Sequence, residues 1–302
     1  MKLLLASSSL LAEPALHAMM NSRHEVLAAV TAPDAPRGRG RDISENEFAQ
    51  LATQLKIPVY KPQSSIELLG TLKSLEPDLV ITISYGRIIK ADSLRFPRYG
   101  WLNVHFSLLP RWRGASPVQR AIAAGDAVTG ITVFKLDEGL DTGPIFTRYE
   151  HTLNGKERTS ELLESLSREA TSPLLQALQM IDDGIAPTPQ SHDGVTLAPK
   201  LLKDDGRIDW KRSAVEIERL IRAYTPWPSA WSMVSGQRIA ITAARLSSQD
   251  IQPGDVSVTN GIHVGCRGSA LEILELKPEG KRNMSAAEWL RGVRQPYGLR
   301  FE

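Results

Sequence analysis

The chain of 302 residues has very little cysteine and no long hydrophobic run. Its single cysteine, Cys266, excludes an intramolecular disulfide and a cysteine-based metal cluster. We therefore expect a reducing compartment and a packed, unreactive thiol. No stretch reaches the roughly 18 apolar residues that a membrane-spanning helix needs, so no membrane association is expected.

The rest of the composition, with 42% hydrophobic and 23% charged residues, is ordinary for a soluble globular protein. The length suggests two domains. Residues 207–302 carry 14 Lys and Arg against 10 Asp and Glu, a net of +4, whereas the remainder has 22 against 24, a net of −2. A basic C-terminal part permits a polyanionic partner without requiring one.

The first residues, Met1–Ala6, resemble the apolar part of a signal peptide. Three serines break the run at once, and Glu13 and Pro14 follow before any small-residue cleavage site. A buried strand, a serine loop and a helix explain this start better. We therefore expect a cytoplasmic protein without a transit extension.

The first half of the chain alternates short apolar runs with helical patterns, which predicts a mostly parallel sheet covered on both faces. A long helical stretch, Thr159–Met180, closes this part. The expected strands are Lys2–Ala6, Val26–Thr31, Leu79–Ser84, Trp101–His105 and Gly130–Leu136, and the expected helices between them are Leu10–Met20, Glu45–Gln54, Ile66–Leu75 and Ser116–Ala124.

A proline-rich connector, residues 185–190, separates this part from the second one. We expect a catalytic domain at residues 1–188, a linker at 189–206 and a C-terminal domain at 207–302. Short strands with turn signals predict that the last is a small OB-like β-barrel. It would contain a helix at Ser213–Ala223 and strands at Ala230–Val234, Gln237–Ile241, Gly261–Gly265 and Ala270–Glu275.

A dinucleotide site is the first alternative for any such parallel sheet. The turn after the first strand is Ser7–Ser9, with no glycine. The Gly38–Gly40 stretch follows the second strand and lacks the third glycine of the fingerprint. Nicotinamide or flavin binding is therefore not expected.

Asn103 and His105 lie two residues apart at the end of an apolar run, so a strand would point both side chains to one face. Asn103 offers an amide donor, and His105 can move a proton near neutral pH. Asp141 supplies a carboxylate from another strand-like segment, although Asp-Thr-Gly can also be a simple turn. Alone, His105 would be read as a core histidine, but the three together fit an acyl-transfer site. No His or Cys lies at ligand spacing, so no metal is expected.

Several motifs together resemble those of the folate-dependent formyltransferases. More narrowly, they resemble the branch of that family that acts on methionyl-tRNA. The match keeps its order over nearly the whole chain, with one departure: the family's Gly-Thr-Pro turn is replaced by Ser7–Ser9. The motifs are Asn103-Val104-His105, Ser107–Pro110, Pro110–Arg120, Leu140–Pro144, Pro33–Pro36, Gly38–Gly40, Ser84–Gly86, Arg207–Trp210, Arg222–Pro228 and Met284–Ala286.

The resemblance implies a Rossmann-like formyltransferase domain and transfer of a formyl group from 10-formyltetrahydrofolate to the α-amino group of initiator methionyl-tRNA. It implies an oxyanion donor in Asn103, a proton carrier in His105 and an orienting carboxylate in Asp141. The implied folate-binding residues are Tyr85, Gly86, Arg87, Ile88, Ile89, Ser107, Leu108, Leu109 and Pro110, and the implied tRNA-binding residues are Arg37, Arg39 and Arg41.

Rival functions share the same catalytic trio. A sugar-nucleotide formyltransferase or a formyltetrahydrofolate hydrolase is the nearest alternative, and a scaffold that only binds nucleic acid is another. The arginine-rich loop and the Pro226-Trp227-Pro228 segment favour tRNA as the acceptor. A monomer is expected, because the chain has no heptad pattern or sustained apolar stripe.

Overall fold

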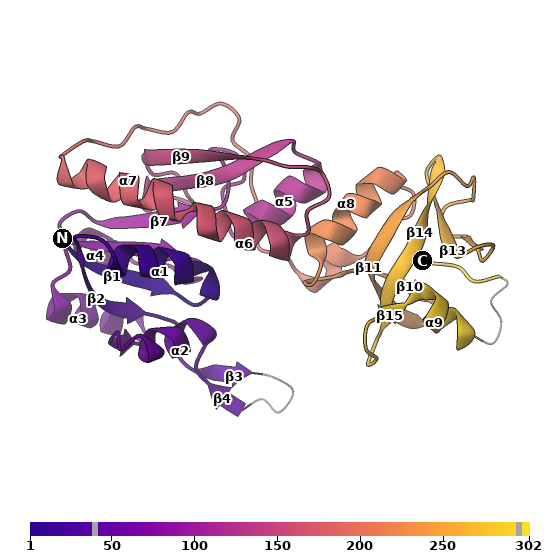
Figure 1. Cartoon of the computed structure of the whole chain (residues 1–302), viewed down its shortest axis with the longest axis horizontal. Helices are drawn as coiled ribbons and strands as arrows, with labels where there is room; N and C mark the ends of the chain where they lie inside the picture. The colour runs from indigo at the N-terminus through magenta and orange to yellow at the C-terminus, as the bar shows by residue number, and fades with distance from the viewer. Residues whose placement is uncertain (38–41, 294–297) are drawn as a thin grey trace. The chain divides into compact units, whose positions relative to one another are not determined.

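The computed structural model describes residues 1–37, 42–293 and 298–302, and Figure 1 shows its elements. The chain forms two compact units. Unit 1 comprises Met1–Pro117, Val128–Thr152 and Leu163–Ala198, and unit 2 comprises Val118–Ala127, Leu153–Leu162 and Pro199–Glu302. The domain limits expected from the sequence, at residues 188 and 207, remain predictions.

Unit 1 is built on a seven-stranded sheet with the strand order β5-β2-β1-β6-β7-β8-β9. The pairs from β5 to β7 are parallel, and β8 and β9 continue the sheet in antiparallel fashion. The mostly parallel sheet expected from the sequence is therefore confirmed. Its strands are β1 Lys2–Ser7, β2 Glu25–Val30, β5 Val59–Tyr60, β6 Leu79–Ile83, β7 Trp101–His105, β8 Val128–Lys135 and β9 Ile145–Thr152.

Helices bury both faces of this sheet, which is why β1 is apolar at successive positions. Leu4 and Ala6 pack in one cluster with Leu68, Leu72 and Leu94 from α3 and α4. Their buried neighbours on β1 point to the opposite face by the alternation of a strand. The helices of unit 1 are η1 Leu10–Ala12, α1 Glu13–Met20, α2 Glu47–Gln54, α3 Ser65–Leu75, α4 Ala91–Arg95, α7 Thr171–Asp182 and the larger part of α6 Thr159–Glu169.

The serine loop after β1 is held by its own hydroxyl groups. The Ser9 side chain accepts a hydrogen bond from Leu11 N and so caps η1. The Ser8 hydroxyl donates to the Tyr85 carbonyl at 3.4 Å and accepts from Ala32 N at 3.3 Å. This loop therefore joins the carboxyl ends of β1, β2 and β6 without a glycine.

The helical stretch expected at Thr159–Met180 is confirmed, and it consists of two helices, α6 and α7, which are separated at Ala170. Pro173 lies in the first turn of α7, where the missing N–H costs nothing, but it cannot continue a helix from before. The Thr171 hydroxyl donates to the Arg168 carbonyl at the end of α6. The expected helix at Leu10–Met20 likewise begins as the short helix η1 before α1.

Unit 2 contains a six-stranded antiparallel sheet with the order β10-β11-β14-β13-β12, and β15 pairs with β14. Arg300 bridges Asp255 near β12, and Phe301 bridges Val234 in β10, so the last residues join the two edges of the sheet. The small C-terminal β-domain is therefore confirmed. Unit 2 also contains α5 Pro117–Ala124 from Val118 on and the first residues of α6. The elements of the C-terminal part are η2 Lys203–Gly206, α8 Ala214–Tyr224, β10 Ala230–Val234, β11 Gln237–Ser247, β12 Val256–Ser257, β13 Ile262–Cys266, β14 Ser269–Pro278, β15 Met284–Ser285 and α9 Ala286–Arg291.

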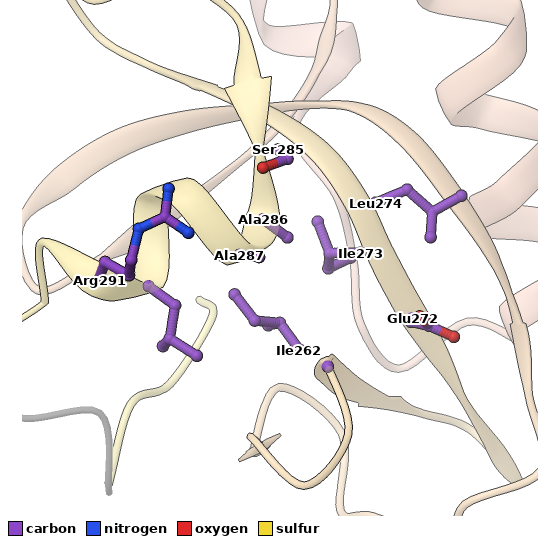
Figure 2. Close-up of a pocket in the computed structure, with 10 residues that line it drawn as sticks. Ile262, Glu272, Ile273, Leu274, Ser285, Ala286, Ala287 and Arg291 are labelled. Carbon is purple, nitrogen blue, oxygen red and sulfur yellow. The ribbon is translucent and has the colours of Figure 1, made fainter.

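A pocket of about 490 Å³ lies in unit 2 between α9 and the strands β13 and β14 (Figure 2). Its walls are largely aliphatic, with Ile262, Ile273 and Leu290 among them. It contains none of the site residues expected from the sequence. Across the described part of the chain, no helix is long and apolar enough to cross a bilayer.

Candidate active site

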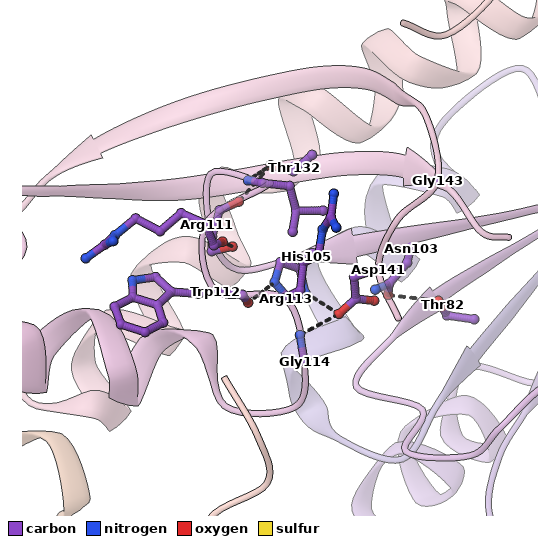
Figure 3. A network of polar contacts seen from close by, with 12 residues as sticks. Thr82, Asn103, His105, Arg111, Trp112, Arg113, Gly114, Thr132, Asp141 and Gly143 are labelled. Carbon is purple, nitrogen blue, oxygen red and sulfur yellow. Dashed lines mark hydrogen bonds and ion pairs between the residues drawn. The ribbon is translucent and has the colours of Figure 1, made fainter. Parts of the chain in front are cut away.

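Asn103 and His105 come from β7, as expected, and stand at the carboxyl end of this strand. The strand pairs with β6 on one side and β8 on the other, with His105 opposite Thr132. Ligands of open parallel sheets bind at this edge. Figure 3 shows the polar contacts that surround the two side chains.

His105 is 5% exposed and its ring is fixed by two neighbours. Its Nε2 lies 2.9 Å from the Trp112 carbonyl oxygen, and its Nδ1 lies 3.8 Å from Asp141 Oδ2. Since a carbonyl oxygen only accepts, the hydrogen of a neutral His105 lies on Nε2 and the lone pair lies on Nδ1. Nδ1, the basic atom, therefore faces the carboxylate.

Burial lowers the pKa of His105 below its ordinary value, because the charged imidazolium loses its water. The Asp141 carboxylate and the Trp112 carbonyl act in the opposite direction, since both favour the protonated ring. The balance leaves His105 neutral at neutral pH. The ring can thus accept a proton, and Asp141 would stabilise the cation that results.

Asp141 does not lie on a strand-like segment, so this expectation is wrong. It lies in the loop between β8 and β9 with a φ of 52°, a left-handed conformation. Its Oδ2 accepts a hydrogen bond of 2.7 Å from Gly114 N. At 3.8 Å the carboxylate is too far from Nδ1 for a direct hydrogen bond, so its effect on His105 is that of a nearby charge.

The Asn103 side chain is oriented by β6. Thr82 Oγ1 donates to Asn103 Oδ1 at 2.9 Å, which turns the amide nitrogen away from β6. Within the residues that the structure describes, this nitrogen donates no hydrogen bond. An oriented amide donor is what stabilises a developing oxyanion.

The loop after β7 is tied to β8 and, through the hydrogen bond from Trp112 N to Thr196 Oγ1, to the segment after α7. Thr132 Oγ1 donates to the Ser107 carbonyl at 2.7 Å and accepts from Leu109 N at 3.1 Å. Leu109 packs in a small cluster with Phe134 and Ile145. The expected folate-binding run Ser107–Pro110 is therefore firmly held beside the strand that carries His105, with Ser107 and Leu109 buried and Leu108 and Pro110 half-buried.

The second expected folate segment, Tyr85–Ile89, follows β6 at the same edge of the sheet. Gly86 has a φ of 72° and open space where a Cβ would lie, and Ile88 is 86% exposed. The Arg87 guanidinium donates to the carbonyls of Pro62 and Gln63, so it holds the turn. Burial raises the pKa of Tyr85, whose ring packs in the core.

Of the expected tRNA-binding arginines, Arg37 ends the strand β3 Ala35–Arg37, which pairs with β4 Asp42–Ser44. Arg39 and Arg41 lie outside the described residues. Lys61 joins the two ends of the hairpin, since its Nζ lies 2.7 Å from Asp34 Oδ1 and 2.9 Å from Glu45 Oε2.

Several residues of the site were missed by sequence reasoning. Thr82 orients Asn103, Thr132 orders the loop after β7, and Gln190 contacts the loop of Asp141. Gln190 lies in the proline-rich stretch that the sequence indicates only as a connector. Among the described residues there is no cluster of three or more His, Cys, Asp or Glu that could hold a metal ion.

The amino-acid sequence matches two family profiles along its length. These are Formyl transferase over residues 1–178 and Formyl transferase, C-terminal domain over residues 200–294. Methionyl-tRNA formyltransferase from Streptomyces griseus subsp. griseus is 40% identical over 305 residues, which cover 99% of this chain and 98% of the relative. The protein of the same name from Arthrobacter sp. is 41% identical over 307 residues, which cover 100% of both chains.

Solved structures share the fold at low sequence identity. Methionyl-tRNA formyltransferase from Clostridium thermocellum superposes with a TM-score of 0.58 at 18% identity, over 90% of this chain and 98% of that one. The N-formyltransferase from Helicobacter canadensis, in complex with folinic acid and dTDP-3-aminofucose, gives 0.69 at 18% identity over the same shares. The sequence matches over nearly the full length decide the relationship: the chain belongs to the formyl transferase family, in its methionyl-tRNA formyltransferase branch.

Proposed function

We propose that this protein transfers the formyl group of 10-formyltetrahydrofolate to the α-amino group of methionyl-tRNA, with the initiator tRNA as the acceptor. The observation that carries the proposal is the group at the end of β7, which consists of an oriented amide, a buried neutral imidazole and a carboxylate. It occurs in a chain about 40% identical to relatives named methionyl-tRNA formyltransferase. Formyl transfer to an amine requires a donor for the developing oxyanion, a base for the amine proton and a charge that stabilises the protonated base.

The reaction forms a bond between the amine nitrogen and the formyl carbon and breaks the bond from that carbon to the folate nitrogen N10. One proton must leave the amine, and one must reach the departing nitrogen. The bound folate supplies the electrophilic carbon and the leaving group. The side chains of this protein must provide the proton transfer and the stabilisation of charge.

Asn103 stabilises the negative charge that develops on the formyl oxygen. Thr82 already holds its carbonyl end, so the amide donor needs no reorganisation when charge develops. His105 takes the amine proton at Nδ1 and returns it to the departing nitrogen. An α-amino group titrates near 8, so a modest base suffices near neutral pH.

Asp141 acts through His105. The imidazolium that forms when Nδ1 is protonated gains the charge of a carboxylate 3.8 Å away in a site with little water. The Gly114 N–H keeps Oδ2 aimed at this place. Asp141 thereby lowers the energy of the charged state that exists only during proton transfer.

The residues at this edge fit a folate. The Tyr85–Ile89 turn has exposed residues, Gly86 and Ile88, beside the packed Tyr85 and Ile89, and such a combination would suit a flat heterocycle. The acceptor would be recognised by the Arg37–Arg41 loop and by the basic residues 207–302, which carry a net charge of +4.

The test is an assay of formyl transfer from 10-formyltetrahydrofolate to initiator methionyl-tRNA, with elongator methionyl-tRNA and a sugar-nucleotide amine as competing acceptors. We expect labelled initiator tRNA. Asn103→Ala should lower kcat about 10²–10³-fold, as the loss of an oxyanion donor usually does, and His105→Ala and Asp141→Ala should each lower it strongly. Labelled sugar, or release of formate without any labelled acceptor, would replace the proposal with one of its rivals.

A further inference from the structure

The chain segment after α7 runs past the loop that carries Asp141. Thr188 pairs with Ile145 at the start of β9 through two hydrogen bonds of 2.7 and 2.8 Å. Further along, Arg113 pairs with the same segment, since its N–H donates to the Thr196 carbonyl and its own carbonyl accepts from Ala198 N. Residues 188–198 are therefore fixed at both ends, and Gln190 lies between the two loops that flank His105.

Gln190 uses its whole side chain to connect these two loops. Its Nε2 donates to the carbonyls of Asp141 and Gly143, both at 2.8 Å. Its Oε1 accepts from the Arg113 guanidinium, at 3.2 Å from Nε and 2.7 Å from Nη2. The Arg113 side chain thus fixes the orientation of the amide, and the amide fixes the Asp141 loop.

The Asp141 loop needs such support, because its conformation is not one that the residue prefers. The φ of 52° at Asp141 is a left-handed conformation that costs energy for a non-glycine residue. Gly143 packs so tightly that a Cβ would lie 1.8 Å from the Lys135 carbonyl oxygen. The carboxylate itself has one direct backbone partner in the described structure, Gly114 N.

We propose that Gln190 is a positioning residue for formyl transfer, which holds the Asp141 carboxylate at the distance from His105 Nδ1 that the reaction uses. The proposal rests on the catalytic role given to Asp141 above. The printed hydrogen bonds of Gln190 join Asp141, Gly143 and Arg113, and none of them joins His105, so its effect on the reaction should pass through the Asp141 loop. It should therefore change the rate of the chemical step rather than the binding of either substrate.

Gln190→Ala and Gln190→Glu test this proposal in the full chain. The glutamate keeps the contact with Arg113 but places a carboxylate oxygen against two carbonyls, so it should release the loop as alanine does. Both variants should lower kcat about tenfold and leave the KM for folate and for methionyl-tRNA within about twofold, as expected for an interaction made only in the transition state. Gln179→Ala, the same substitution on the exposed surface of α7, is the matched control and should leave kcat unchanged.

A double-mutant cycle separates positioning from a general loss of structure. In an Asp141→Asn background the further change Gln190→Ala should cost less than about twofold, because the carboxylate that it positions is already gone. The acid limb of the kcat–pH profile should also move to lower pH in Gln190→Ala, since a displaced Asp141 no longer raises the pKa of His105.

Two results would overturn the proposal. One is an unchanged kcat in Gln190→Ala, whether or not its thermal stability falls, and the other is losses that multiply fully in the double variant. Turnover of the wild-type protein with methionyl-tRNA tests the proposed function by itself. If another amine proves to be the acceptor, the same variants are compared with the wild type on that acceptor, so the two proposals can fail separately.

Discussion

At the scale of single residues, the contacts of His105 decide its chemistry. The Trp112 carbonyl holds the hydrogen on Nε2, which leaves Nδ1 as the only basic atom of the ring. A purely structural histidine would be held by one hydrogen bond in the core. His105 has in addition a carboxylate 3.8 Å from its second ring nitrogen. The combination of burial with a nearby charge is typical of catalytic groups rather than of packed ones.

The pH dependence of the reaction follows from these contacts. Burial lowers the pKa of His105, so the acid limb of kcat should lie below the ordinary value of 6.5. Asp141 raises this pKa, and Asp141→Asn removes that effect, so the limb should move to still lower pH while the plateau falls. The measurement is kcat at saturating substrates from pH 5 to 8.

The control for this shift is a second histidine with an acidic partner in the same unit. His151 Nδ1 lies 2.9 Å from Glu169 Oε2. Glu169→Gln should leave the acid limb where it is. If Asp141→Asn moved the limb upward, or not at all, the assignment of the limb to His105 would be wrong.

At the scale of elements, Gly143 shows where a loop of the site has no room for a side chain. Gly143→Ala would place a Cβ 1.8 Å from the Lys135 carbonyl oxygen, so the Asp141 loop must move. We expect a loss of kcat of roughly tenfold or more, because small displacements of catalytic groups are costly.

Gly70 in α3 is the opposite case, with nothing within 4 Å and no unusual φ. Gly70→Ala should raise the free energy of unfolding by about 0.5–1 kcal/mol, and thermal denaturation of both variants checks the pair. A stabilised Gly143→Ala variant would contradict this view of the loop.

The β3–β4 hairpin gives a second prediction at this scale. Lys61 binds Asp34 before β3 and Glu45 after β4, and its pKa is raised chiefly by the hydrogen bond to Asp34. Lys61→Met should free the base of the hairpin and raise the KM for methionyl-tRNA several-fold, on the order of 1 kcal/mol, with the KM for folate unchanged. Lys73→Met, on the exposed surface of α3, is the matched control. Equal changes of both KM values would show that the hairpin does not serve the acceptor.

The sequence predicts these elements unequally, for a physical reason. Trp101–His105 is predicted with the bounds that it has, because its apolar residues Trp101, Leu102 and Val104 are mostly buried and a loop with Pro110 follows directly. The conformation of Asp141 is not predictable in this way. It depends on Gly114 N and on Gln190, which lie 27 and 49 residues away in the chain. Local sequence patterns carry no information on such distant contacts. The motif therefore identifies Asp141 as a candidate, and only the structure shows its conformation and its partners.

At the scale of the whole molecule, charge is divided between the parts of the chain. Residues 207–302 carry a net charge of +4 and the remainder −2, and Arg37, Arg39 and Arg41 place three guanidinium groups close together in the sequence of the otherwise acidic part. A polyanionic acceptor would be drawn to the basic segments, whereas the proposed folate site would depend on shape and hydrogen bonds. The two substrates should therefore respond differently to salt.

The last prediction is this difference in salt dependence. Each tRNA phosphate that the protein neutralises releases counterions and contributes about −0.7 to −0.9 to the slope of log affinity against log salt. With about three such contacts, the KM for methionyl-tRNA should rise roughly 20-fold between 50 and 200 mM salt. The KM for folate, measured at saturating tRNA, should change far less. Arg39→Ala should make the slope for tRNA shallower by about one phosphate's share, and Lys73→Met should not. A KM for tRNA that stayed constant over this range would mean that the basic segments do not bind the acceptor, and recognition would then have to rest on the methionine and the terminal nucleotides alone.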